Sequence, residues 1–335
     1  MTYQLNNIIQ ASDFNTFATG SASGQPLNST PNINSVLGVG YGIMGYGQTA
    51  LSSVAVNDTI SASNWADMTS AMSRASLHQN SSLGTFTTAT SDALIKYQSN
   101  LATNINTVYN NRLNARSQGT STTYQSINAA NPWRNTLTNT FVASFDNGDK
   151  ARYFFNSGGQ IKFTVAHSSS SGALNNMFNE LAIDIGTLTF SAPNSGTLRL
   201  GAFTYTNYTG LTQTGYENEG YINPNWRPVY NTNHGYYALS TTNQTIFKQI
   251  ATAESTTYAA YGDSYISLSV SSNGSQGPNG DVGNIITFNV VYGLIPSGSP
   301  INGTSTVNCT VVEPETTYLA NSWGTVGITS KITTT

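Results

Sequence analysis

The sequence predicts an α+β protein: an N-terminal arm and a helical segment, followed by a mainly antiparallel, sandwich-like β domain with one short helix. Three observations support this prediction. Short runs in the second half alternate apolar and polar residues with period two, as half-buried strands do. Between about residues 60 and 120, apolar residues recur instead at helical spacings of three and four. Clusters of Gly, Ser, Asn and Thr separate these segments and are typical of turns and linkers.

Residues 1–50 are expected to form an extended arm and a glycine–tyrosine loop. The first 40 residues show little periodicity, so we expect them to gain structure from neighbouring subunits. The run from Gly38 to Gln48 has a glycine spacing like that of a phosphate-binding loop. No Lys-Ser/Thr pair follows it and no clear strand precedes it, so we favour a tight loop whose tyrosines pack over bare backbone.

Residues 51–120 are expected to form a helical assembly segment. A short strand over Val54–Ile60 precedes a first helix, which begins near Ser61 or Ser63, since either residue can cap it. The apolar stripe of this helix starts at Trp65, and the helix ends at His78, close to the carboxyl end of the helix dipole.

A second helix is expected from about Ser91 to Arg116. Ala, Asn and Thr fill much of it, so it needs a partner: the first helix, the β domain, or the same helix in another subunit. Part of its stripe repeats every seven residues, as along a coiled-coil seam. The candidate oligomer contacts are Leu94, Leu101, Ile105 and Val108.

Residues 121–335 are expected to form the β-rich domain, with a β-meander as its nucleus. The meander consists of strands over 141–145, 151–155 and 161–165, with an Asn-Gly turn after the first strand. An amphipathic helix through Leu174 and Leu181 follows. Further strands are expected from Leu188, over 197–205, near 246–250, and over 264–270, 285–292 and 307–312.

Charge and targeting signals narrow the function classes. Only 8% of the residues are charged, against roughly 25% in typical soluble domains. The 12 Lys and Arg residues are scattered singly, which disfavours nucleic-acid binding. The N-terminus has neither the basic nor the apolar region of a signal peptide, and no apolar run is long enough to insert into a membrane. We therefore expect synthesis in a host cytoplasm without a signal peptide.

No catalytic or metal site is expected, and no cofactor. Cys309 is the single cysteine, so we predict a small buried strand residue and no intrachain disulfide. The close glutamate pairs, Glu217 with Glu219 and Glu313 with Glu315, fit surface decoration better than a glycosidase acid pair. The histidines, His78, His167 and His234, lack zinc-site spacing, and Asp281 lacks a full calcium-loop pattern.

The long polar stretch 206–237 is rich in aromatic residues. Long loops of this kind are often functional. Its aromatic side chains would either stack on sugar rings, order the loop, or pack between subunits. The candidate sugar-stacking residues are Tyr208, Tyr216, Tyr221, Trp226, Tyr230 and Tyr236.

Several segments resemble virion structural proteins of tailed bacteriophages, the T4-like marine cyanophage type above all. The resemblance is carried by 151–163, by Tyr265-Ile-Ser-Leu, by Ile286-Thr-Phe-Asn-Val, by Gly45-Tyr-Gly-Gln48, and by the stretch from Trp65 to His78-Gln79. It covers about two thirds of the chain. The resemblance assigns no functional residues to this chain, because the matching segments contain no catalytic motif.

The resemblance implies a virion location more strongly than a particular position on the virion. We therefore expect a non-enzymatic, tail-, neck- or fibre-associated component that forms homo-oligomers and contacts other virion proteins. The alternative hypothesis is a displayed adhesion module that binds host surface glycans through the aromatic loop.

Overall fold

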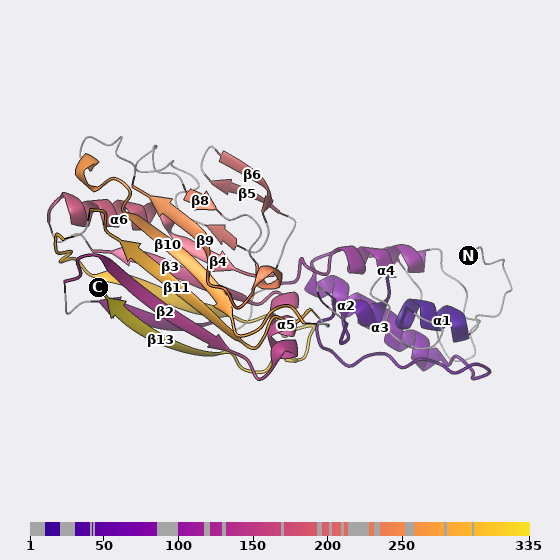
Figure 1. Cartoon of the computed structure of the whole chain (residues 1–335). Helices are drawn as coiled ribbons and strands as arrows, with labels where there is room; N and C mark the ends of the chain where they lie inside the picture. The colour runs from indigo at the N-terminus through magenta and orange to yellow at the C-terminus, as the bar shows by residue number, and fades with distance from the viewer. Residues whose placement is uncertain are drawn as a thin grey trace. The chain divides into compact units, whose positions relative to one another are not determined.

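The computed structural model describes residues 11–20, 31–40, 42, 44–85, 100–116, 121–128, 132–168, 171–192, 196–200, 203–208, 211–213, 228–230, 235–251, 258–277, 280–296 and 298–335 (Figure 1). The chain divides into two compact units. The helical unit comprises residues 1–119, 152–159 and 313–324, and the β unit comprises 120–151, 160–312 and 325–335. The predicted α+β class with a sandwich-like β part is confirmed.

The helical unit contains four helices of its own and shares a fifth with the β unit. The first four are α1 (Ala11–Ala18), α2 (Ile33–Val36), α3 (Ala62–His78) and α4 (Asn100–Asn110). The border between the units falls inside α5 (Gly148–Asn156), after Ala151. One border lies at Gly119, beside the division expected from the sequence, whereas the two later segments of the helical unit were not expected.

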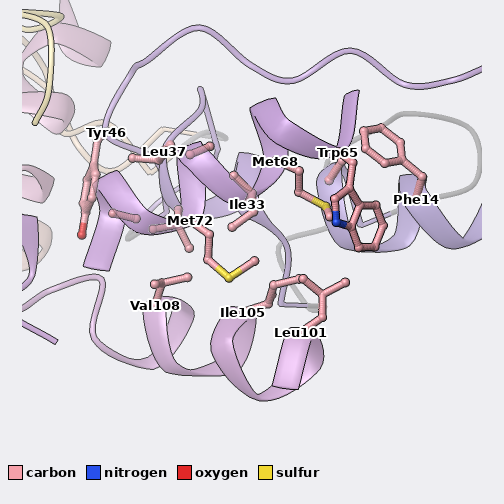
Figure 2. Close-up of a cluster of buried hydrophobic side chains, with 14 of the residues drawn as sticks. Phe14, Ile33, Leu37, Tyr46, Trp65, Met68, Met72, Leu101, Ile105 and Val108 are labelled. Carbon is pink, nitrogen blue, oxygen red and sulfur yellow. The ribbon is translucent and has the colours of Figure 1, made fainter. Parts of the chain in front are cut away.

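Helix α3 begins and ends where the sequence predicts. The Ser61 hydroxyl accepts from the Asn64 backbone N–H, and the Asn64 side chain accepts from the Ser61 N–H, which forms a capping box. Trp65, Met68 and Met72 of this helix point into the core of the helical unit (Figure 2).

The expected extended arm is wrong for the described part of residues 1–40. Phe14 of α1, Ile33 of α2 and Leu37 are buried in the same core as α3 (Figure 2). Each helix is too short to be stable alone, so burial of these side chains against α3 and α4 must hold it. Helices α1 and α2 were not predicted because their apolar residues show little helical periodicity in the sequence.

Buried side-chain amides clamp the connections of the helical unit. In each clamp, one amide accepts from the backbone N–H and donates to the C=O of a single residue, as a neighbouring strand would. All eight bonds measure 2.7–2.9 Å, and the clamps are Asn15 on Val54, Asn34 on Leu51, Asn104 on Gly84 and Gln48 on Ala320. The strand expected over Val54–Ile60 is therefore absent, because a side chain and no second strand pairs with Val54.

Helix α5 replaces the strand expected over 151–155. The Asn147 side chain accepts from the Lys150 N–H at 3.0 Å, so the expected turn residue caps a helix. Ala151, Phe154 and Phe155 are buried at helical spacing. All residues from Ala151 to Asn156 are buried, so the tertiary environment on every side of the helix overrides the β propensity of the aromatic run.

The β unit is built of antiparallel strand pairs throughout its described part. One sheet has the order β1 (Ser121–Asn128), β12 (Ser305–Val312), β3 (Gln160–His167), β4 (Thr187–Phe190), β7 (Leu211–Gln213). The other has the order β13 (Gly327–Thr334), β2 (Thr136–Ser144), β11 (Ile285–Gly293), β10 (Tyr265–Ser272), β9 (Gln244–Ile250), β8 (Pro228–Tyr230). The remaining elements are the pair β5 (Gly196–Leu200) and β6 (Phe203–Tyr208), helix α6 (Ala173–Ile185), and the short helices at Tyr236–Ala238 and Ala259–Tyr261.

The two sheets pack face to face, and aromatic side chains from both fill the space between them. Phe163 of β3 lies with its ring centroid 5.6 Å from that of Phe141 in β2 and 4.9 Å from that of Phe288 in β11. The Tyr292 hydroxyl, also on β11, donates toward the carbonyls of Ala166 and Thr306 in the opposite sheet. The expected meander is wrong, because β2 and β3 lie in different sheets.

The later strands and the amphipathic helix follow the sequence prediction closely. Strands β9, β10, β11 and β12 lie where strands were predicted near 246–250 and over 264–270, 285–292 and 307–312. Helix α6 contains the predicted helical stripe. Cys309 is buried within β12, as expected. Strand β13 was not expected: its Thr-rich sequence lacks apolar alternation, and it forms by pairing with β2 along its whole length.

The amide clamps yield a prediction that uses two asparagines of one helix. Asn104→Ala in α4 removes both bonds to Gly84, so the N–H and C=O of this exposed residue lose their protein partner. We expect the free energy of unfolding of the helical unit to fall by about 1–3 kcal/mol. The exposed Asn106→Ala makes the same change in helix propensity and should stay within about 0.5 kcal/mol of the wild type. Urea unfolding measures both variants, and equal values would contradict a structural role for the clamp.

Candidate functional site

The predicted sugar-stacking residues do not all lie where a ligand would reach them. Tyr236 is fully buried, and its hydroxyl points toward the Gly148 carbonyl at 3.4 Å, so it is removed from the set. Tyr208 and Tyr230 lie in β6 and β8, respectively. Tyr216, Tyr221 and Trp226 lie outside the described residues. The glycan hypothesis thus stays a prediction about the loop without Tyr236.

The predicted oligomer contacts are core residues of one chain. Leu101, Ile105 and Val108 are at most 1% exposed and pack in the helical unit beside α2 and α3 (Figure 2). The sequence left three possible partners for this helix: the first helix, the β domain, or a second copy. In the structure it packs against the first helix, α3. A stripe that is already covered has no face left for a second copy. Leu94 lies outside the described residues.

The glutamate pair at Glu313 and Glu315 holds the segment 313–324 in the helical unit. The Glu313 carboxylate accepts from the Trp323 indole N–H at 2.6 Å. Glu315 forms an ion pair with Arg116 at 3.8 Å, and its backbone N–H donates to the Arg116 carbonyl. These partners give the two acids structural roles. Glu217 and Glu219 lie outside the described residues.

Two histidines are buried in polar surroundings. The Nε2 of His78 lies 2.9 Å from the Ser157 carbonyl, which can only accept, so Nε2 carries the proton. His167 contacts the Ser305 hydroxyl and the Asn175 amide oxygen through its two ring nitrogens. Burial lowers the pKa of both imidazoles below the usual value. His234 lies outside the described residues, and among the described ones no group of three acidic, histidine or cysteine side chains is placed to hold a metal.

The glycine–tyrosine loop holds a buried cation of its own chain. Arg152 is 1% exposed, and its guanidinium donates to the carbonyls of Met44 at 2.8 Å and Val39 at 3.1 Å. Asn156 donates to further carbonyls of the same loop. The loop therefore points carbonyl oxygens at α5, which is the opposite polarity to the N–H groups of a phosphate-binding loop.

Glycines are required where this loop meets α5. Gly47 has a φ of +70°, and a Cβ there would collide with the ring of Tyr153. Tyr46 of this loop is buried: its hydroxyl donates to the Arg112 carbonyl at 2.6 Å and accepts from the Gln79 amide at 2.8 Å. Burial raises the pKa of this phenol well above its usual value, so it stays neutral and donates.

One groove with ligand-sized volume lies in the helical unit. It measures about 360 Å³ and runs between α3 and the segment Thr49–Ser52, with Phe14 of α1 beside it. Such a volume is at the lower end of known small-ligand pockets. Its α3 wall is polar and consists of Asn64, Asp67, Ser70 and Arg74. Nothing in the local sequence signalled this groove, because it combines residues from three separate segments.

Comparison with protein-family models, curated proteins and solved structures found no match. None of the described helices has the length and apolar content needed to cross a lipid bilayer.

The buried histidines predict a loss of stability in mild acid. Their folded pKa lies below the unfolded value of about 6.5, so the unfolded chain binds more protons as the pH falls. The free energy of unfolding should be fully retained above that value and should decrease from pH 6.5 toward pH 5. The double variant His78→Gln, His167→Gln should flatten this slope, although it is less stable at pH 7.5. An unchanged slope in the double variant would show that other groups take up the protons.

The glycan hypothesis predicts binding that depends on the aromatic loop. On a glycan array, the native chain should bind and Trp226→Ala should lose that binding, because stacking on sugar rings needs the indole face. Tyr318→Ala, a change to a half-buried aromatic outside the loop, should bind like the native chain. Absence of binding by the native chain, or normal binding by Trp226→Ala, would contradict the hypothesis.

Proposed function

We propose that the chain is a non-enzymatic structural component of a tailed-phage virion, associated with the tail, neck or a fibre. In this role the two units provide building blocks with few charges, and contacts with other virion proteins and with further copies are repeated by symmetry. The resemblance carried by 151–163 and by the segments within β10 and β11 supports this assignment.

The observation that carries the proposal is the low number of charges on the exterior of the sandwich. Hydroxyl and amide side chains bond across neighbouring strands where a typical soluble domain would place charges. The pairs are Thr123 with Thr310, Thr164 with Thr187, Thr136 with Thr335, and Thr140 with Asn289. Such contacts are not screened by salt as ion pairs are, so they suit a particle that persists in media of varying ionic strength.

The net charge favours close packing of copies. A formal charge of −3 on 335 residues produces little like-charge repulsion between neighbours in an assembly. With 8% charged residues the chain has few groups that can form ion pairs, and Arg116 with Glu315, at 3.8 Å, is one such pair. Oligomer contacts would come from surfaces other than the buried α4 stripe.

The architecture is compatible with this role by analogy alone. Two-sheet antiparallel sandwiches occur in viral capsid proteins and in lectins, and they also host many unrelated functions. The analogy therefore leaves room for the displayed adhesion module, whose test concerns the aromatic loop.

Mass spectrometry of density-purified virions tests the proposal. Peptides from both units should be present in the particle at a stoichiometry of several copies, and cryo-electron microscopy should show density for the sandwich outside the genome-filled interior. Presence in the infected-cell lysate together with absence from purified particles would contradict the proposal. A matched preparation washed at high salt should retain the chain, because the proposed contacts are uncharged.

A further inference from the structure

The groove of the helical unit has a free backbone edge along one wall. Leu51 turns its N–H and C=O to the side chain of Asn34, at 2.7 and 2.9 Å, in the pattern of one residue of an antiparallel ladder. On an extended chain the neighbouring residues direct their groups to the opposite side. Ala50 and Ser52 are exposed, and their backbone groups have no partner among the described residues.

The opposite wall presents two opposite charges on one face of α3. Asp67 and Arg74 are seven residues apart, which corresponds to about 10 Å along the helix axis. Both side chains line the groove and are exposed, and neither forms an ion pair within the described part of the chain. In a chain with 8% charged residues, two unpaired charges beside one groove need an explanation.

Thr49–Ser52 is an irregular segment with free backbone groups opposite a helix, and domains that bind peptides by adding a strand use free backbone groups in the same way. The backbone of the ligand supplies the affinity there, and side chains directed at the helix supply the specificity. A sugar would use the polar wall, but it would not satisfy the N–H and C=O groups in their alternating order. Phe14 is 1% exposed, so it offers no ring face for stacking on a sugar.

We propose that this groove binds an extended polypeptide segment, which pairs its backbone with Ala50 and Ser52 and carries a basic side chain for Asp67 and an acidic one for Arg74. At about 3.3 Å per residue, the two charges of the ligand would be two to four residues apart. In the virion such a segment would come from a neighbouring protein. The binding itself is a property of the isolated chain and does not rest on the virion assignment.

Fluorescence anisotropy with the full chain tests this inference. The probes are labelled Thr/Val decapeptides that contain one Lys and one Glu, two to four residues apart and in either order. One order should bind more tightly, because Asp67 and Arg74 define a direction along the groove. Asp67→Lys combined with Arg74→Glu should invert this preference, by about two- to fivefold for each charge. Both positions are exposed, so the variant should fold like the native chain.

The backbone part of the inference is tested separately. Ser52→Pro removes one N–H from the free edge and should weaken every peptide of the panel by about two- to tenfold, whatever its charge order. Ser53→Ala, beside it, is the matched control and should leave binding unchanged. Circular dichroism spectra and thermal unfolding verify that each variant is folded.

Three results would overturn the inference. They are the absence of peptide binding, peptide binding that the charge exchange leaves unchanged, and binding of an oligosaccharide by the groove in place of the peptides. Failure to find the chain in virions would leave the peptide result intact, so the two proposals fail independently.

Discussion

Buried polar groups must be paired, and in the helical unit four buried side-chain amides meet this requirement by bonding to the backbone of irregular connections. A primary amide carries a donor and an acceptor, so one Asn or Gln can pair with a whole residue as a strand would. Asn15, Asn34, Asn104 and Gln48 each do so at distances of 2.7–2.9 Å. The abundance of asparagine therefore has a structural reason. These clamps hold irregular connections against short helices without adding charge, and one of them pairs with Leu51, which lines the groove.

Pairing of buried groups without an opposite charge also occurs where α5 meets the glycine–tyrosine loop. The loop neutralises the desolvation cost of Arg152 with main-chain carbonyls, and its glycines allow the close approach of Tyr153. The β unit uses a different solution, in which rings of opposite sheets pack at centroid distances of about 5 Å and backbone groups pair in ladders. Both units thus remain stable with few charges, and this property links the fold to the proposed virion role.

The sequence predicted those elements whose signals are local. Helix α3 has its capping box and its apolar spacing within Ser61–His78, and β10 to β12 have clear alternation. Elements fixed by distant partners were missed: α1 depends on a shared core, β13 on pairing with β2, and α5 on a cap together with a loop more than 100 residues away. The site followed the same rule. Burial of Tyr236 and the coming together of Phe14, Ser52 and Asp67 arise from tertiary contacts that no local pattern encodes.

One of the amide clamps joins two parts of the helical unit that are translated at very different times. Gln48 is held by Ala320, and Arg116 meets Glu315, so the helical unit is completed by a segment translated after nearly all of the β unit. Roughly 200 residues separate its first 119 residues from that segment, which corresponds to about 10–40 s of translation at about 5–20 residues per second. During that interval the nascent helices lack their closing piece. The helical unit therefore closes only after the strands up to β12 have been translated.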